Sequence, residues 1–350
     1  LKQEIKELKN IKNLEVKVRT SVAAYHGYNY LLARENLTDH LEKKDKQGKI
    51  RQRLLKIRAK KVILATGALE RPLIFNNNDR PGIMLSSAVN KYADFYGVVC
   101  GQKTVFFTNN DSAYESAFCL HNKGIKVEAI IDIRDNSNSK IVKAVKDVGI
   151  KIHWSHTVVD TSGYKRLKNI SVMRLSNDGM SVTGNRIKIS SDCLGVSGGW
   201  TPAVHLFTQS GGKLSFDEEN MVFLPNKYPS KQISIGSCNG DFEISEIIKN
   251  LSKNLKEFLK IEKTDFDNIS VDSDYERSKR NIWLLPSDKP VGKTKPFVDY
   301  QNDATAKDIK LALREGFRSI EHVKRYTTTG MGTDQGKLGN MHALGIIADT

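Results

Sequence analysis

The stretch Lys60-Lys-Val-Ile-Leu-Ala-Thr-Gly67 decides how this chain folds. Its apolar centre predicts a short buried strand, and small residues follow at the end of that strand. Small residues let a backbone pass close to a ligand, because they remove the side chains that would hold it away. The stretch therefore predicts a strand that ends beside a bound dinucleotide, with Ala65, Thr66 and Gly67 as contacts.

A second strand ends in a matching way farther along the chain. Ile233-Ser-Ile-Gly-Ser-Cys-Asn-Gly-Asp241 is followed by a helical pattern over residues 243–259. In such a strand–glycine–aspartate–helix arrangement, the aspartate accepts from a ribityl or ribose hydroxyl and the helix N-terminus faces a phosphate. We expect Gly236, Gly240 and Asp241 to complete the site, although Asp241 could also be a simple helix cap.

The segment that returns the chain toward this site is Asp192-Cys-Leu-Gly-Val-Ser-Gly-Gly-Trp-Thr-Pro202. It reads as a strand running into a glycine turn. We therefore assign residues 1–75 and 193–258 to the C-terminal part of a first nucleotide-binding domain. The Gly-rich turn that usually opens such a domain is not found here, and we expect it upstream of Leu1, in a longer protein of which this chain is an internal fragment.

Residues 76–192 predict a second, Rossmann-like domain. A buried strand over residues 103–107, a helix over 112–122 and a strand over 126–132 form a βαβ unit. The remaining elements are expected as a helix over residues 140–148 and strands over 151–154, 170–175 and 186–189.

The turn of that βαβ unit argues against a second nucleotide site. It reads Thr108-Asn-Asn-Asp-Ser-Ala113, so no glycine stands where a close approach to pyrophosphate needs one. Asp111 would repel the phosphate at the helix N-terminus and is better interpreted as an N-cap. Asp132 stands where a ribose-binding acid is expected, yet the departures favour a structural role for the domain.

The N-terminal residues predict a helix over 3–9 and a strand over 14–20. Two further strands, over residues 28–32 and 50–55, flank a polar stretch and predict a hairpin-like pair. Residues 259–296 read as a linker, in which Trp283 is the expected docking anchor.

A glycine-rich loop follows the helical run over residues 306–324. It reads Arg325-Tyr-Thr-Thr-Thr-Gly-Met-Gly-Thr-Asp-Gln-Gly-Lys337. Glycines expose backbone N–H groups, while hydroxyls and cations supply further donors, and this chemistry suits a phosphate. A tight turn between helices is the alternative. The candidate phosphate contacts are Arg325, Thr327, Thr328, Thr329, Gly330, Gly332, Gln335 and Lys337.

Taken together, these motifs resemble one family, the alpha subunit of heterotetrameric sarcosine oxidase. The segments that carry the resemblance are residues 65–68, 70–72, 77–84, 107–114, 297–303, 305–309, 314–328 and 330–337. The resemblance implies an α/β fold of the flavoprotein type with two dinucleotide-binding, Rossmann-type domains. A small helical module over residues 297–350 then leads toward a folate-binding domain.

The module over residues 297–350 also resembles one that holds a 2Fe–2S cluster in related amine and opine dehydrogenase subunits. Such a cluster needs four thiolates. The matching positions are Asp299, Gln301, Asp334 and Gly339, none of which is a cysteine. We therefore expect the fold of the module without its cluster, and no metal site.

The resemblance implies the oxidative demethylation of sarcosine to glycine, with hydrogen peroxide and 5,10-methylenetetrahydrofolate as the other products. It implies NAD in this subunit, FMN shared with a beta subunit, FAD in the beta subunit, and tetrahydrofolate in a C-terminal domain beyond Thr350. The partners would be beta, gamma and delta subunits. No catalytic residue is expected in this chain.

Two alternatives to this function stay open. One is an alpha subunit of a related proline, opine or other amine dehydrogenase. The other is a non-catalytic subunit in which a degenerate nucleotide fold serves only to bind its neighbours.

Composition limits the other possibilities. The chain has 350 residues and a net charge of +15, but its lysines are spread out and form no dense basic block among aromatic residues, so we expect no nucleic-acid partner. No run of 18 apolar residues indicates a membrane span. Four widely spaced cysteines predict neither disulfides nor a cysteine-rich metal site, which is typical of a cytoplasmic protein.

Overall fold

The computed structural model describes residues 7–8, 10–271, 274–277 and 282–350. The chain divides into two compact units, which are described separately. Unit 1 comprises residues 1–67, 202–217 and 223–269, and unit 2 comprises residues 68–201, 218–222 and 270–350. This division differs from the predicted domain boundaries, because residues 68–75 and 193–201 fall in unit 2.

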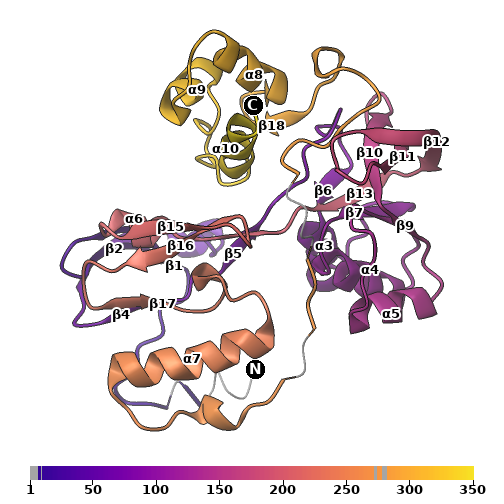
Figure 1. Ribbon diagram of the computed structural model, residues 1–350. Coiled ribbons are helices and arrows are strands. Elements are labelled where there is room, and N and C mark those ends of the chain that lie inside the picture. Colours follow the sequence, from indigo (N-terminus) through magenta and orange to yellow (C-terminus); the bar gives the residue numbers. More distant parts are fainter. Residues whose placement is uncertain (1–6, 9, 272–273, 278–281) are drawn as a thin grey trace. The chain divides into compact units, whose positions relative to one another are not determined.

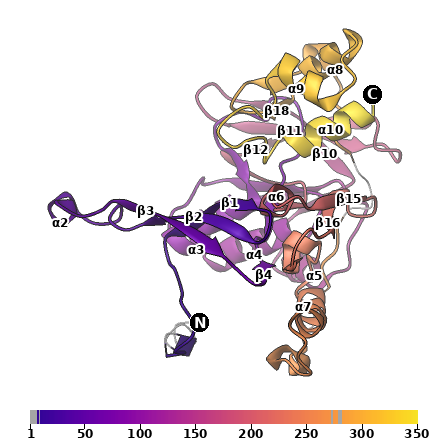
Figure 2. The ribbon, with the colours of Figure 1, turned by 90° about the vertical axis from the view of Figure 1, so that its left-hand side faces the viewer.

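An antiparallel meander forms the N-terminal part of unit 1. Strands β1 (Thr20–His26), β2 (Tyr30–Asn36) and β3 (Gln52–Arg58) pair in that order, and Tyr30 lies opposite Arg58. Figure 2 shows β2 and β3 extending together toward the short helix α2 (Lys43–Lys46) at their tip. The predicted hairpin-like pair is therefore confirmed, with both strands placed about two residues later in the chain.

The strand predicted over residues 14–20 is wrong, because the chain runs there through turns and irregular backbone until β1 begins at Thr20. Leu14, Val16 and Val18 alternate as a strand requires, yet they are exposed. An alternating pattern makes a strand only where a neighbouring strand accepts its backbone hydrogen bonds. The helix predicted over residues 3–9 lies largely outside the described residues.

The stretch that opened the sequence analysis forms β4 (Val62–Leu64), which pairs in parallel with β17 (Gln232–Ser234). Val62 and Leu64 join Tyr25, Leu31 and Phe207 in the core of unit 1. The remaining elements are α6 (His205–Gln209), β15 (Lys213–Asp217), β16 (Val222–Lys227) and α7 (Ile244–Leu259).

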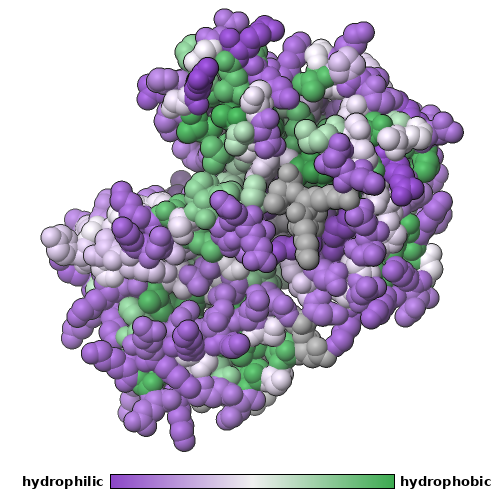
Figure 3. Space-filling model, viewed as in Figure 1, coloured by the Kyte–Doolittle hydropathy of each residue, from purple (hydrophilic) through white to green (hydrophobic). Residues whose placement is uncertain are grey.

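Helix α7 covers its apolar residues only in part. Ile244 is 57% exposed and Leu259 is 38% exposed. Figure 3 shows hydrophobic patches among hydrophilic surface in the region where α7 lies in Figure 1. Ser252 is the buried residue of this helix. Unit 1 thus has a small core and a helix whose apolar side still meets solvent.

A five-stranded parallel sheet forms the centre of unit 2. Its strand order is β6 (Ile83–Leu85), β13 (Cys193–Ser197), β7 (Thr104–Thr108), β8 (Val127–Asp132) and β9 (Ile152–Trp154). All five residues of β7 and all five of β13 are buried. Such continuous burial is expected of parallel strands that are covered on both faces.

Helices α3 (Ser86–Tyr96), α4 (Ser112–Asn122) and α5 (Lys140–Asp147) cover this sheet. Val89, Ala117 and Val142, one from each helix, share a buried cluster with Phe106 and Ile130 of the strands. Figure 1 shows α3 and α4 side by side next to β7 and β13, in agreement with their contacts. The predicted βαβ unit is confirmed, and α4 has the predicted bounds.

A second, antiparallel sheet completes the Rossmann-like part of unit 2. It contains β10 (His156–Ser162), β11 (Asn169–Leu175) and β12 (Val182–Ser190). The sequence analysis predicted parts of β11 and β12 but missed β10. Two short strands, β5 (Ala68–Glu70) and β14 (Trp200–Pro202), pair with each other.

The C-terminal helical module holds β18 (Phe297–Asp299), β19 (Ala304–Thr305), α8 (Ala306–Arg314), α9 (Ile320–Thr327) and α10 (Asn340–Ala348). A single helical run over residues 306–324 is wrong, since the chain turns at Gly316, whose φ is +95°. Trp283 is the predicted anchor: it is 7% exposed and shares a core with Val298, Ile309 and Ala343.

Candidate dinucleotide and phosphate sites

The two predicted dinucleotide-contacting segments, residues 65–67 and 236–241 (here called the stations), lie at one edge of the parallel pair in unit 1. Leu64 of β4 is in register with Ser234 of β17. The Ile235 N–H donates to the Leu64 carbonyl at 2.9 Å just beyond the paired residues. Since parallel strands end at the same edge, residues 65–67 and 236–241 leave the sheet together. The structure thus brings the two predicted stations to one place.

Asp241 carries an unsatisfied oxygen at this edge. Its side chain is buried, and Oδ1 accepts a hydrogen bond from Asn250 Nδ2 at 2.7 Å. Oδ2 is also buried but has no partner among the described residues. Burial raises the pKa of the Asp241 carboxyl, while the amides of Asn250 and Asn239 act against this rise. A buried acceptor without a donor is costly, so this oxygen is poised to accept from a ligand hydroxyl.

The backbone around Asp241 is shaped by glycines. Gly236 opens a short 3-10 turn, Gly236–Asn239, and Gly240 ends it with a φ of +94°. Asp241 comes next, and α7 begins only at Ile244 with Glu243 as its N-cap. Asp241 therefore is not the cap of α7, which was the alternative interpretation.

The other station is open on its ligand side. Ala65 and Thr66 are exposed, and Thr66 Oγ1 donates to the Ala203 carbonyl at 2.7 Å. Gly67 has a φ of +70°, and a Cβ built on it would meet no atom within 4 Å. The left-handed backbone conformation therefore favours glycine at position 67, and the space beside it is free for a ligand.

In unit 2 the acids in and near the corresponding turn, residues 108–113, are already bound by other protein groups. Asp111 occupies the N-cap position of α4, but its side chain makes no capping bond, so that expectation is wrong. Instead, its Oδ1 accepts from Arg134 Nη1 at 2.8 Å and its Oδ2 accepts from the Glu276 N–H at 2.8 Å. Asp132, at the expected ribose-binding position, is also buried and is bound by Arg134 and by Tyr114.

The predicted phosphate loop follows α9 in the helical module, and many of its donors are already used. Thr327 Oγ1 and Thr329 Oγ1 lie 2.7 Å apart and bond to each other. Thr328 Oγ1 donates to the Thr327 carbonyl at 2.6 Å. The Gly330 N–H donates to Asp299 Oδ2 at 2.7 Å. The expectation of a freely exposed Gly330 amide is therefore corrected, since Asp299 holds it.

The rest of the loop has a more open end. Arg325 and Lys337 are exposed, and neither side chain forms an ion pair or hydrogen bond with any other described residue. Gln335 is exposed too and donates from Nε2 to the Gly332 carbonyl at 2.9 Å. These two cations could meet an anion without breaking a bond to another described residue.

The four positions that the sequence analysis matched to cluster cysteines lie in or close to this loop. Asp299 accepts from the N–H groups of Gln301 at 2.8 Å, Asn302 at 3.0 Å and Gly330 at 2.7 Å. Burial alone would raise the pKa of Asp299, but these donors outweigh it and hold the pKa below its ordinary value. Gln301 Oε1 accepts from Thr333 Oγ1 at 3.0 Å. Carboxylate and amide oxygens thus organise this loop.

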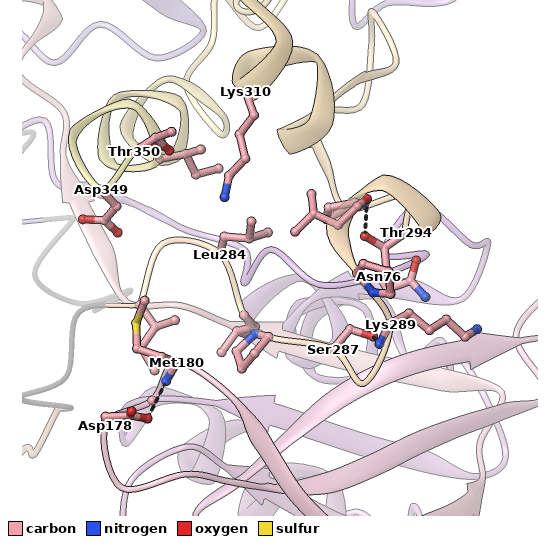
Figure 4. A pocket seen from close by; sticks show the side chains of 18 residues that line it. Asn76, Asp178, Met180, Leu284, Ser287, Lys289, Thr294, Lys310, Asp349 and Thr350 are labelled. Carbon is pink, nitrogen blue, oxygen red and sulfur yellow. Dashed lines mark hydrogen bonds between the residues drawn. The ribbon is translucent and has the colours of Figure 1, made fainter. Parts of the chain in front are cut away.

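A cavity of about 420 Å³ in unit 2 lies away from the predicted phosphate loop (Figure 4). Lys310 points into it from α8, and Asp349 and Thr350 border it at the end of α10. Leu284 and Met180 supply apolar walls. None of the sequence-predicted site residues lines this cavity.

Other functional classes find little support in the described part of the chain. Within it, no three His, Cys, Asp or Glu side chains gather as metal ligands. None of its helices is both long and apolar enough to span a membrane. The four cysteines are free thiols.

Sequence reasoning missed three residues that decide the state of these sites. Asn250 of α7 orients Asp241, and Arg134 with Glu276 neutralises and covers the turn in unit 2. A polar residue on the inner side of an amphipathic helix could have signalled Asn250. No local pattern signals Glu276, because its backbone reaches across 165 positions of sequence.

Known proteins resemble this chain along most of its length. Residues 293–350 match the family model described as the sarcosine oxidase A3 domain. The chain is 36% identical over 341 residues to the sarcosine oxidase alpha subunit of Corynebacterium sp. (strain P-1), a match covering 94% of this chain and 34% of that protein. It is 34% identical over 353 residues to the alpha subunit of Rhizobium meliloti (strain 1021), covering 98% and 33%.

Among solved structures, L-proline dehydrogenase from P. horikoshii superimposes with a TM-score of 0.63 at 18% identity. The match covers 99% of this chain and 62% of that one. At this identity the likeness concerns the fold, which is the predicted Rossmann-type α/β architecture. The chain spans about a third of the length of the curated relatives it matches.

Proposed function

This chain belongs to the family of sarcosine oxidase alpha subunits over the third of their length that it spans, and we propose that it is the nucleotide-holding and flavin-contacting part of such an enzyme. The reaction consumes sarcosine, O₂ and tetrahydrofolate, and yields glycine, hydrogen peroxide and 5,10-methylenetetrahydrofolate. Two electrons and two protons leave the CH3–NH unit of sarcosine, so that its C–N single bond becomes a C=N double bond. They reduce O₂ to hydrogen peroxide, and the oxidised carbon passes to tetrahydrofolate.

Unit 1 is the proposed NAD site. The supporting observation is the buried Oδ2 of Asp241, which lacks a partner among the described residues and lies at the edge from which residues 65–67 also emerge. A ribose hydroxyl would supply the missing donor. Ala65, Thr66, Gly67, Gly236 and Gly240 would allow the close approach of the dinucleotide backbone.

The loop from Arg325 to Lys337 is the proposed FMN contact. Its exposed cations could bind the FMN phosphate by charge-assisted hydrogen bonds, at a contact shared with a beta subunit. The threonine hydroxyls and the Gly330 amide shape the loop from within. FAD would belong to the beta subunit and tetrahydrofolate to a further domain, with gamma and delta subunits completing a cytoplasmic complex.

The chain's own chemical task in this scheme is to bind and orient cofactors. The bound flavins would supply the redox chemistry, and the residues described here would fix their phosphate and ribose groups. No described group of acid, base and nucleophile stands ready to carry the oxidation, so the reaction centre would lie in a partner.

Nucleotide retention tests the NAD assignment. Asp241→Ala should weaken retention by about 1–3 kcal/mol, the range for loss of a hydrogen bond to a buried acceptor. Mass spectrometry of the denatured, purified complex would count NAD per chain. Glu262→Ala, which removes an exposed acid of the same unit, is the control. Full NAD occupancy in Asp241→Ala would show the assignment wrong.

Flavin content tests the loop assignment. Lys337→Met and Arg325→Met should each lower FMN content while FAD in the complex stays at its normal level. Lys307→Met on the exposed side of α8 is the matched control. Normal FMN in both loop variants would reduce the loop to a structural turn. No nucleotide of any kind in the complex would favour a purely structural interaction subunit.

A different substrate would identify the other alternative. Oxidation of proline or an opine by the complex, without turnover of sarcosine, would place it with the related dehydrogenases. Peroxide formation with each substrate separates these cases.

A further inference from the structure

The parallel sheet of unit 2 reverses its strand order at one point, here called the crevice, where open α/β sheets usually bind ligands. From β7 the chain proceeds to β8 and then β9 on one side, whereas β13 and β6 lie on the other side. The order therefore reverses between β7 and β13. In open α/β sheets ligands bind at such a point, beyond the carboxyl ends of the strands. Here those ends are Thr108 and Ser197.

A short segment of the same chain lies across this point. Residues 274–277, here called the strap, come from the linker that precedes the helical module. Arg277 forms an antiparallel bridge with Asn110, which itself donates to Ser197 Oγ at 3.1 Å. The Asp111 N–H donates to the Glu276 carbonyl at 3.0 Å. The Glu276 N–H donates back to Asp111 Oδ2 at 2.8 Å.

Arg134 joins the strap to both acids of the crevice. Its guanidinium is almost fully buried and lies 2.8 Å from Asp111 Oδ1 and 2.8 Å from Asp132 Oδ2. It also donates to the Glu276 carbonyl at 3.0 Å. The acid in the ribose-binding position and the start of α4 are therefore both satisfied from within the protein.

The first residue of the strap binds a second helix. Asp274 Oδ2 accepts from the Lys140 N–H at 2.6 Å, at the start of α5. A carboxylate at a helix N-terminus meets the same amides and dipole that bind a phosphate. The strap thus contacts the N-terminal ends of both helices that flank β8.

We propose that residues 274–277 are the built-in ligand of this crevice, a peptide strap that takes the place of a dinucleotide. Four independent contacts carry this assignment: the bridge at Asn110, the paired bonds with Asp111, the Arg134 link and the Asp274 bond to α5. Unit 2 would then bind no NAD(P)H, and the chain would hold one dinucleotide, in unit 1. The closure itself does not depend on the substrate of the enzyme.

Hydrogen–deuterium exchange on the purified full-length protein tests the strap. Glu276→Pro removes the N–H that binds Asp111, whereas Glu276→Ala changes only an exposed side chain and keeps the backbone bonds. We expect exchange over residues 108–116 to rise about tenfold or more in Glu276→Pro and to stay unchanged in Glu276→Ala. Equal exchange in the two variants would overturn the proposal.

A second pair of variants covers the case in which Glu276→Pro does not fold. Asp274→Ala should raise exchange over residues 140–143 by about threefold, because the Lys140 N–H loses its acceptor. Asp274→Asn keeps an acceptor oxygen and should behave as the wild type. Exchange in Asp274→Ala at the wild-type rate would contradict the strap.

NADH is the probe that separates a closed crevice from a displaceable strap. Added to the wild-type protein, NADH should leave exchange over residues 108–116 and 274–277 unchanged. Slower exchange at 108–116 together with faster exchange at 274–277 would show that the nucleotide displaces the strap, and would refute permanent closure. NAD counted at one per chain supports the assignment, and two per chain opposes it.

Discussion

Unit 1 and the Rossmann-like part of unit 2 each have an acid on the carboxyl side of a parallel strand, but the two acids differ in whether their oxygens are already bound. Asp241 keeps one buried oxygen for which the described residues supply no partner, whereas both oxygens of Asp132 are bound by Arg134 and Tyr114. Asp111, near the same crevice, is bound as well. An acid in a ligand position becomes a ligand contact only when the protein leaves its oxygen unsatisfied.

The two units also differ in how well they bury their apolar residues. The apolar side of α7 in unit 1 is partly exposed, whereas β7 and β13 in unit 2 are buried throughout. A region with unpaired buried polar groups and exposed apolar surface can gain free energy by binding a ligand. A region that has satisfied its own groups gains little from a ligand.

The largest effect should come from opening the closed crevice. Arg134→Leu leaves two buried carboxylates without their cation and should lower the free energy of unfolding by about 3–5 kcal/mol. Urea denaturation measures it. Arg186→Leu breaks the half-exposed pair with Asp288 and should cost at most about 1 kcal/mol. Similar losses in both variants would mean that the crevice acids are not held by Arg134.

The next effect concerns the stability that Asp299 contributes by accepting hydrogen bonds from backbone amides. Asp299→Ala removes the acceptor for three backbone N–H groups and should destabilise the helical module by about 2–3 kcal/mol. Because its folded pKa is lowered, this contribution is present above the unfolded value of about 4 and is lost as pH falls below it. Thermal unfolding at pH 7 and pH 3 would follow it.

Glu321→Ala, an exposed acid on α9, serves as the control for Asp299→Ala. It should change stability by a few tenths of a kcal/mol, as expected for a helix-end charge. If the control lost as much stability as Asp299→Ala, the network around Asp299 would not be the cause.

An effect that is smaller per pH unit concerns a buried histidine of the helical module, on α10. His342 is 3% exposed, and its pKa is lowered to about 3 by burial and then by the charge of Arg71. The folded state therefore keeps it neutral while the unfolded chain binds a proton below about pH 6.5. Stability should fall by about 1.4 kcal/mol for each pH unit below that value.

His342→Phe should flatten this slope between pH 6.5 and pH 4, and His40→Phe, at an exposed position, should leave it unchanged. Urea midpoints across that range measure both. An unchanged slope in His342→Phe would assign the acid sensitivity to other groups.

The smallest effect concerns NAD retention at the proposed site around Asp241 in unit 1. Asn250→Ala frees the second oxygen of Asp241 and should weaken NAD retention by about 1 kcal/mol, less than Asp241→Ala. NAD counted after gel filtration is the readout. Asn254→Ala, one turn farther along α7, is the matched control. Equal retention in Asn250→Ala and the control would remove Asn250 from the site.

Local patterns predicted most elements where the signals were local. Helix α4 has its predicted bounds because Asp111 precedes a helical run, even though its side chain bonds elsewhere. Helices α8 and α9 were joined in the prediction because their apolar spacing continues across Gly316. Strand β10 was missed, and residues 14–18 failed as a strand because none of the described strands pairs with them.

The sequence by itself determined the two stations of unit 1, since parallel strands must end at one edge wherever they lie in the chain. Tertiary structure alone decided which of the buried carboxylates kept an oxygen without a hydrogen-bond donor among the described residues. Arg134 is 23 positions from Asp111 and Glu276 is 165 positions away, and neither distance leaves a trace in a local pattern. The pairing of a buried oxygen depends on which distant donor the fold brings within about 3 Å, and only the folded chain sets that.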